Sequence, residues 1–227
     1  MDFCEWHKSR RGITPAPRPM FDFLERAIEQ DKADPDSLEP YIRFFKSLPF
    51  HIQVKVPGKG RKTVIYDIVH AWTPPKGMSA LSREACYLWD RENAFAGNEE
   101  NDHIIIHGHT PTTYESRFVP EAVPGMILYR KNAINIDCGC VFSPRHETSP
   151  CMLAGICLET LEEIYPYTIE ERMKMQLPDV PEDKRTAVIK ELEKKHNMYL
   201  QNGFRTEMLE RLGQDRIRTV PKAGMGL

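Results

Sequence analysis

The sequence lacks the features that mark membrane proteins and nucleic-acid-binding proteins. No apolar run in its 227 residues approaches the roughly 20 residues that cross a bilayer. Neither sign of charge dominates, because 31 Lys and Arg residues face 33 Asp and Glu residues, which gives a formal net charge of −2. This balance predicts no nucleic-acid partner and no membrane partner. The first residues are charged and no apolar stretch follows them, so we also expect no secretory signal.

Cysteine is sparse as well. The six cysteines are Cys4, Cys86, Cys138, Cys140, Cys151 and Cys157. Their low number in a chain of this length favours free thiols in a reducing compartment, so we expect a cytoplasmic protein. The short spacings around Cys140 and Cys151 lack the paired Cys-x-x-Cys pattern of structural zinc sites. Buried small thiols in strands are the better interpretation.

What is present is the composition of a globular protein, with 41% hydrophobic and 28% charged residues. Residues 1–47 read as a helical N-terminal segment, with apolar residues at helical spacing after a proline-rich stretch. Residues 48–167 are rich in short apolar strands, and residues 168–227 are charged with a helical pattern. By composition this last segment is a packing or dimerising element, so we expect its helices to allow self-association.

The middle zone predicts a sheet with flanking helices. Period-two alternation over 51–56 and 63–70, joined by a Pro-Gly-Lys-Gly turn, predicts a β-hairpin. A helix is expected over 79–93 and a second hairpin around 159–162. The remaining strands are expected at 103–107, 125–129 and 133–137. We therefore predict an α/β fold with a mixed or antiparallel sheet and a helical C-terminal extension.

Two of these strands end on histidine. His70 closes one strand, and His107-Gly108-His109 closes another. Neutral imidazole is a good ligand for a divalent transition metal, and Gly108 leaves room for His109 to turn over the strand end. Each histidine taken alone is more often a hydrogen-bonded strand-end residue. His107 and His109 share a face only if the strand continues through Gly108.

Arg91 is a candidate phosphate ligand. It follows Trp89 closely, and an arginine beside an aromatic anchor can hold a phosphate with two donors. The alternative is a solvated helix arginine paired with Asp90 or Glu92. Spacing alone favours that alternative.

The order of these motifs resembles a known family. The motifs are Phe45-Lys46-Ser47-Leu48-Pro49, Ile68-Val69-His70-Ala71, Leu88-Trp89-Asp90-Arg91-Glu92, Ile105-Ile106-His107-Gly108-His109-Thr110-Pro111-Thr112, Ile134-Asn135-Ile136-Asp137-Cys138-Gly139-Cys140-Val141-Phe142 and Leu153-Ala154-Gly155-Ile156-Cys157-Leu158. Together they resemble the C-terminal half of the calcineurin-like metallophosphoesterases. The closest resemblance is to bacterial and phage serine/threonine protein phosphatases and their diadenosine tetraphosphatase relatives.

The resemblance implies a site with two divalent metal ions, most often manganese, with iron or zinc as other options. It implies that His70 and His109 ligate the second metal ion and that Arg91 binds phosphate. His107 has no role in the family pattern, and an apolar or aromatic residue is common at that position.

The sequence also departs from the family. The Gly-Asp motifs that supply the first metal ion's ligands are absent, because the chain contains no Gly-Asp dipeptide. Gly97-Asn98-Glu99 matches the family's Gly-Asn-His-Glu motif only superficially. Two of the six ligand side chains of the family pattern can therefore be placed. We expect a truncated chain with part of the two-sheet sandwich, inactive or nearly so on its own.

Three functions remain open at this point. The first is metal-dependent phosphoester hydrolysis, with a serine/threonine phosphoprotein as substrate, represented by an incomplete chain. The second is a degenerate, non-catalytic phosphoesterase module that binds a partner through its sheet or its C-terminal helices. The third is hydrolysis of a dinucleoside polyphosphate or another small phosphoester, which the motifs do not separate from the first.

Overall fold

The computed structural model describes residues 43–44, 46–99, 102–142 and 149–214. The helices expected near 21–28 and after 34–35, and the end of the chain from 216, lie outside these residues. The chain divides into two compact units, 1–49 and 50–227. In the first unit, the described residues before Leu48 are helical, and Ser47 Oγ donates a 2.7 Å hydrogen bond to the carbonyl of Phe44.

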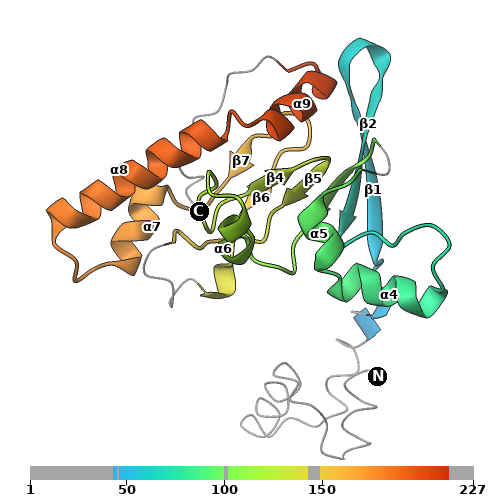
Figure 1. The fold of residues 1–227 in the computed structure, drawn as a ribbon, viewed down its shortest axis with the longest axis horizontal. Helices are drawn as coiled ribbons and strands as arrows, with labels where there is room; N and C mark the ends of the chain where they lie inside the picture. Colours follow the sequence, from blue (N-terminus) through green and yellow to red (C-terminus); the bar gives the residue numbers. More distant parts are fainter. Residues whose placement is uncertain (1–42, 45, 100–101, 143–148, 215–227) are drawn as a thin grey trace, which may run out of the picture. The chain divides into compact units, whose positions relative to one another are not determined.

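The second unit is built on a five-stranded mixed sheet (Figure 1). The strands are β1 (His51–Pro57), β2 (Thr63–Val69), β3 (Ile104–His107), β4 (Leu128–Arg130) and β5 (Ala133–Asn135). Their order is β1-β2-β3-β5-β4, with β2, β3 and β5 parallel and with β1 and β4 antiparallel at the edges. With the helices that follow, this sheet confirms the predicted α/β class.

The predicted hairpin is confirmed by the pairing of β1 with β2, which runs from His51 opposite Val69 to Pro57 opposite Thr63. Its tip is the 3₁₀ turn η2 (Lys59–Arg61), in which Gly60 has a φ of 64°. Glycine adopts this left-handed conformation without steric cost, which explains the tight reversal. The strand expected at 125–129 is shorter than predicted, because the backbone turns at Gly125 with a φ of 84° before β4 begins.

Six α-helices lie among the described residues of the second unit. They are α4 (Ala80–Trp89), α5 (Glu92–Ala96), α6 (Thr112–Glu115), α7 (Ile169–Gln176), α8 (Glu182–Tyr199) and α9 (Gly203–Leu212). Short elements complete the unit: η3 (Ser116–Phe118), η4 (Cys140–Phe142) and the hairpin of β6 (Gly155–Ile156) with β7 (Glu163–Ile164). That small hairpin was predicted from the sequence.

The prediction of a single helix over 79–93 is wrong in one respect, because two helices, α4 and α5, occupy this segment. Asp90 has extended backbone, with a ψ of 128°. Its carboxylate accepts hydrogen bonds from the backbone N–H and the side-chain amide of Asn93. Short polar side chains that bond nearby backbone groups commonly interrupt a helix in this way, and the break places Arg91 at the start of α5.

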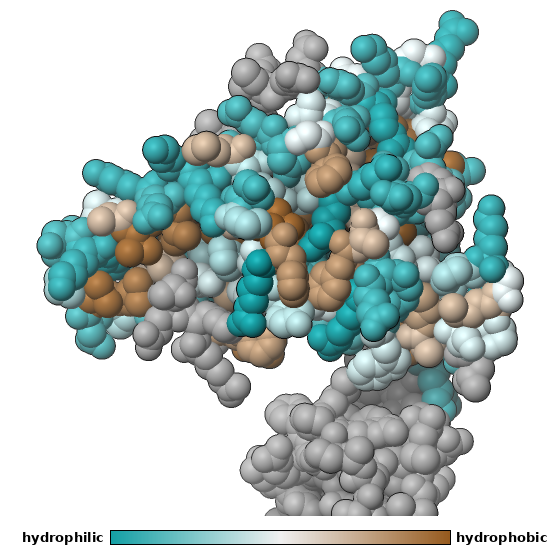
Figure 2. All heavy atoms as spheres, viewed as in Figure 1, coloured by the Kyte–Doolittle hydropathy of each residue, from teal (hydrophilic) through white to brown (hydrophobic). Residues whose placement is uncertain are grey.

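The sheet is covered on both faces. On one face Val69, Ile105 and Ala133 pack with α4 and α5 residues. On the other face Tyr66, Ile104 and Ile134 belong to a larger core that includes residues of α7, α8 and α9. Figure 2 shows hydrophilic residues along the outer side of α8 and hydrophobic residues gathered between α8 and α7. Among the described residues, no helix combines the length and the apolar character needed to cross a bilayer.

Candidate functional site

Three parallel strands end at the same edge of the sheet and carry polar residues there. His70 directly follows β2, Gly108 and His109 follow β3, and Asp137 lies two residues beyond β5. The loops are joined by a 2.9 Å hydrogen bond from the N–H of Gly108 to the carbonyl of His70. A shallow hollow of about 290 Å³ lies at this edge. It is lined by Ile68, Val69, His70, Ile106, His107, Gly108, His109, Ile136 and Asp137.

The two histidines predicted as metal ligands face each other across this hollow. Nε2 of His70 lies 3.1 Å from Nδ1 of His109, and the ring centroids are 4.9 Å apart at an interplanar angle of 61°. His109 reaches this position with a φ of 67°, a left-handed conformation. A Cβ on Gly108 would lie only 3.3 Å from the Cβ of Asp137, so the turn has little room for a larger residue.

The distance between these nitrogens fits two ligands of one metal ion. Two imidazole nitrogens that each bind a metal at ~2.1 Å lie ~3.0 Å apart at a right angle and ~3.4 Å apart at a tetrahedral angle. The 3.1 Å between His70 and His109 falls within this range. Partial burial, followed by the positive charge of Arg91 and the proximity of His70, lowers the pKa of His109. His109 is therefore neutral near pH 7, the form that binds metal.

Arg91 lies close enough to this pair for its charge to act on His109. It is exposed at the N-cap of α5, and no ion pair with Asp90 or Glu92 forms in the described part of the chain. The indole of Trp89 packs edge-on against the ring of His109, with centroids 5.6 Å apart. The guanidinium is therefore available beside the histidine pair, as a phosphate ligand would be.

His107 does not join the pair. Strand β3 ends at His107, so its ring and that of His109 diverge at Gly108. His107 is only 1% exposed and packs edge-on against Trp72, with centroids 5.2 Å apart. Burial lowers the pKa of His107 to about 4. The structure therefore places it in the packing beneath the hollow.

Two residues that sequence reasoning missed hold the site loops together. The buried Asn135 donates a 2.7 Å hydrogen bond from Nδ2 to the carbonyl of Thr110, and its Oδ1 accepts one of 2.8 Å from the N–H of Asp137. Asp137 in turn accepts from the N–H of Gly139 through Oδ1 and lines the hollow. The sequence signal that could have indicated these two residues is their position as polar residues at the end of an apolar strand.

The described residues contain no group of three or more His, Cys, Asp or Glu side chains arranged to hold a metal ion. The histidine pair with Arg91 thus offers two metal ligands and one phosphate ligand, and Asp137 adds a carboxylate at the rim. Donor sets of imidazole suit zinc, iron and related divalent metals, and a carboxylate suits manganese.

The five cysteines among the described residues are free thiols, which are Cys86, Cys138, Cys140, Cys151 and Cys157. Burial raises the pKa of Cys151 to about 11. Burial also raises the pKa of Cys86, to about 12. Both thiols are therefore protonated at neutral pH, and a protonated thiol is a poor metal ligand and a poor nucleophile.

The comparisons with known proteins add no relative to this picture. No protein-family model matches the sequence, and no curated protein and no solved structure was found to be similar to it.

Proposed function

We propose that His70 and His109 bind one divalent metal ion and that Arg91 binds a phosphoryl group beside it, within a metal-dependent phosphoester hydrolase. The observation that carries this proposal is the 3.1 Å separation of His70 Nε2 from His109 Nδ1, next to an unpaired Arg91. Manganese is the first choice of metal, with iron or zinc as alternatives. The resemblance to calcineurin-like metallophosphoesterases supports the same assignment.

Each residue has a distinct part in this proposal. A bound metal ion supplies Lewis-acid polarisation of a phosphoryl oxygen. His70 Nε2 and His109 Nδ1, 3.1 Å apart, would be the imidazole ligands of the metal ion, and the Arg91 guanidinium offers parallel donors that match two phosphoryl oxygens. Trp89 packs against His109 and restrains its ring. The serine/threonine phosphoprotein substrate rests on the resemblance, and a hollow this shallow suits a group presented on a protein surface.

A second candidate function is a non-catalytic module that binds metal and phosphate without turnover. It is favoured by the lack of a three-ligand group in the described part of the chain. The lack of any Gly-Asp dipeptide in the sequence supports it as well. A single ion on two imidazoles does not provide the paired metals that activate a bridging water.

The metal proposal is tested by titrating the protein with Mn²⁺ and Zn²⁺ in a calorimeter. We expect one site, lost in His70→Ala and in His109→Ala. His51→Ala is the matched control, because His51 is also partly exposed at a strand end but bonds Asp67 instead. Equal binding by all four proteins would overturn the assignment of the ligands.

Turnover separates the two functions. p-Nitrophenyl phosphate, a phosphoserine peptide and diadenosine tetraphosphate are each offered with Mn²⁺. Metal binding without turnover supports the non-catalytic module. Hydrolysis that His109→Ala abolishes supports the enzyme, and the preferred substrate among the three decides between a phosphoprotein and a dinucleoside polyphosphate. We propose a reducing cytoplasm as the setting, since the five described thiols are all free.

A further inference from the structure

Three aromatic side chains, from α5, α6 and η3, form a cluster at the protein surface. The ring centroids of Phe95, Tyr114 and Phe118 lie 5.6 to 6.0 Å apart in each pair, and we call these residues the aromatic cluster. Tyr114 is 45% exposed and Phe118 is 63% exposed, although large apolar side chains are normally withdrawn from water. Exposed apolar groups that gather in this way commonly mark a surface that binds another molecule.

The aromatic cluster adjoins the candidate site through two helices. Phe95 follows Arg91 by four positions, so the two residues share a face of α5 and lie one turn, or about 6 Å, apart along it. Helix α6 begins directly after Pro111, two residues beyond His109, and carries Tyr114. A molecule whose phosphoryl group contacts Arg91 can therefore reach the aromatic cluster with a neighbouring part.

The angles between the rings fit an amino-acid side chain better than a nucleobase. Phe95 is tilted by 42° to Tyr114 and by 56° to Phe118, and the last two rings meet edge to face at 72°. A planar base stacks on a flat ring face. Tilted rings form an uneven apolar surface instead, and a bulky side chain packs on such a surface by edge-to-face and aliphatic contacts.

Arginine side chains flank the aromatic cluster. The guanidinium carbon of Arg117 lies 5.4 Å from the ring centroid of Tyr114, and that of Arg130 lies 5.8 Å from the ring centroid of Phe95. One face of each ring is thereby occupied, which leaves less ring surface for a stacked base. In the described part of the chain, neither of the exposed residues Arg117 and Arg91 forms an ion pair. Both cations therefore favour an acidic partner, such as a phosphorylated peptide.

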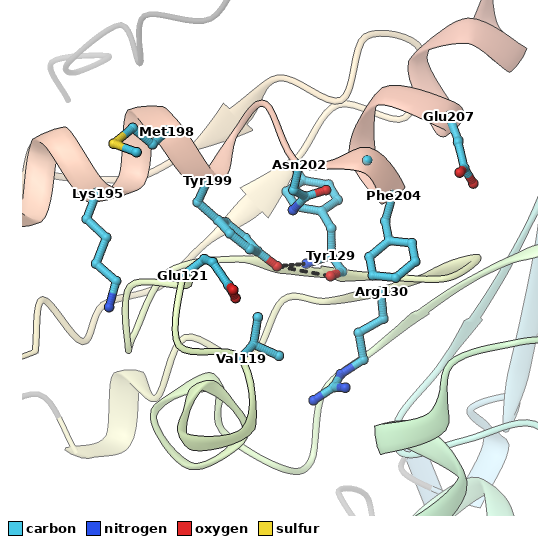
Figure 3. Close-up of a pocket in the computed structure, with 11 residues that line it drawn as sticks. Val119, Glu121, Tyr129, Arg130, Lys195, Met198, Tyr199, Asn202, Phe204 and Glu207 are labelled. Carbon is cyan, nitrogen blue, oxygen red and sulfur yellow. Dashed lines mark hydrogen bonds between the residues drawn. The ribbon is translucent and has the colours of Figure 1, made fainter.

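The apolar surface continues from the aromatic cluster into a cavity of about 490 Å³ between α8, α9 and β4 (Figure 3). Val119, the residue after Phe118, lines this cavity, and so does Arg130, whose guanidinium lies over Phe95. Phe204 lines the cavity from α9 and is 43% exposed. The apolar surface is thus longer than one side chain, which suits a segment of a protein better than a small phosphoester.

We propose that the aromatic cluster binds a large apolar side chain of a phosphoprotein substrate whose phosphorylated residue contacts Arg91. This inference rests on the proposed function, because it names the substrate class of the same site. An extended peptide advances about 3.3 Å per residue, and side chains two positions apart point to the same side. The distance of about 6 Å from Arg91 to Phe95 along α5 therefore corresponds to an apolar side chain two positions from the phosphorylated one.

Three peptides test the inference. They are an alanine-rich phosphoserine peptide and two derivatives with phenylalanine two positions before or two positions after the phosphoserine. Binding is followed in two-dimensional ¹H–¹⁵N spectra of the whole chain, with the amides of Tyr114 and Phe118 as reporters. We expect one phenylalanine peptide to bind roughly tenfold more tightly than the alanine peptide. Equal affinities for all three peptides would overturn the inference.

A variant locates the bound side chain. Phe118→Ala is expected to remove the gain from phenylalanine and to leave binding of the alanine peptide unchanged. Tyr167→Ala is the matched control, because Tyr167 is 45% exposed, as Tyr114 is, and lies outside the aromatic cluster. A gain that survives in Phe118→Ala would refute the inference. Adenosine 5′-monophosphate that shifts the same amides and binds more tightly than the phenylalanine peptides would also refute it.

Unphosphorylated versions of the peptides separate this inference from the proposed function. A gain from phosphorylation that Arg91→Gln abolishes supports the phosphate role of Arg91. If phosphorylation raises affinity and phenylalanine does not, the inference fails and the proposed function stands. If phenylalanine raises affinity and phosphorylation does not, the aromatic cluster binds peptides but the role of Arg91 is refuted, and the assignment of a phosphoprotein substrate fails with it.

Discussion

Nε2 of His196 donates a 2.9 Å hydrogen bond to Oε2 of Glu163, and each side chain is only 3% exposed. The same carboxylate accepts from the hydroxyls of Tyr165 and Tyr129, at 2.7 Å and 2.9 Å. Three donors thus converge on one buried group. This network ties helix α8 to strands β7 and β4 and holds the C-terminal helices on the sheet.

Replacing Glu163 by Gln is expected to destabilise the protein strongly. The carboxylate accepts three buried hydrogen bonds and Gln has only one acceptor oxygen, so buried donors are left unpaired, at about 1–3 kcal/mol each. Denaturant unfolding of both proteins at neutral pH measures the loss. Glu162→Gln is the control, since Glu162 is the neighbouring residue outside this network; a loss of equal size in both variants would contradict the role of the network.

The same carboxylate makes the stability of the fold sensitive to acid. Burial alone would raise the pKa of Glu163, but His196 and the tyrosine hydroxyls outweigh it and lower the pKa below the ordinary 4.5. A carboxyl with a depressed folded-state pKa contributes stability above its unfolded pKa and loses it as the pH falls through the folded value. Wild-type stability should therefore drop below about pH 4.5, and Glu163→Gln should lack this part of the drop.

His107→Phe should raise stability at acidic pH and leave metal binding intact. His107 is neutral in the fold because burial lowers its pKa from 6.5 to about 4. The stability that neutral His107 contributes is therefore fully present above pH 6.5 and is lost as the pH falls toward 4. The reason is that this histidine is protonated at a higher pH in the unfolded chain than in the fold. Thermal unfolding between pH 7 and pH 4 should show the advantage of the variant growing as the pH falls. Loss of Mn²⁺ binding in the variant would instead make His107 a ligand.

Gly97→Ala is expected to destabilise the protein. Gly97 ends α5 with a φ of 81°, and a Cβ there would lie 2.8 Å from the backbone oxygen of Lys131. The left-handed backbone alone costs a non-glycine residue about 1–2 kcal/mol, and the clash adds to it. Gly203→Ala is the matched control, because open space surrounds Gly203 and its φ is not positive. Equal unfolding midpoints for the two variants would contradict this explanation.

Asn135→Ala tests whether metal binding at the candidate site depends on the hydrogen bonds between the site loops. It removes both hydrogen bonds that join Thr110 to Asp137 and leaves buried backbone groups unpaired, at about 1–3 kcal/mol each. We expect lower stability together with weaker Mn²⁺ binding at His70 and His109. Asn93→Ala removes a side-chain hydrogen bond to Asp90 at the start of α5 and should leave Mn²⁺ binding unchanged. Lower stability with unchanged metal affinity would show that Asn135 is structural only.

The local parts of the fold could be predicted from the sequence, while the contacts between distant segments could not. Alternation and a glycine-containing turn located the β1–β2 hairpin, because both are local properties. The break at Asp90 depends on a side-chain bond that competes with the helix, which periodicity does not report. Helix α7 was not separately predicted, although its capping box of Thr168 and Glu171 was a readable signal.

For the candidate site, too, the individual residues could be predicted from the sequence and their contacts could not. His70 and His109 were recognised as strand-end histidines, and the parallel order that brings them together became visible only in the sheet. The roles of Asn135 and Asp137 depend on hydrogen bonds between loops. The Glu163–His196 pair joins residues 33 positions apart, so no local pattern could indicate it.

The hydroxyl of Tyr199 has a consequence for the solubility of folded molecules. Strand β4 is the last in the sheet, and an outermost strand normally offers free amide and carbonyl groups to the strand of another molecule. At Tyr129 both groups are already bound by one side chain from α8. An incoming chain would have to displace that helix before it could pair there, so the C-terminal helices shield this border of the sheet from aggregation.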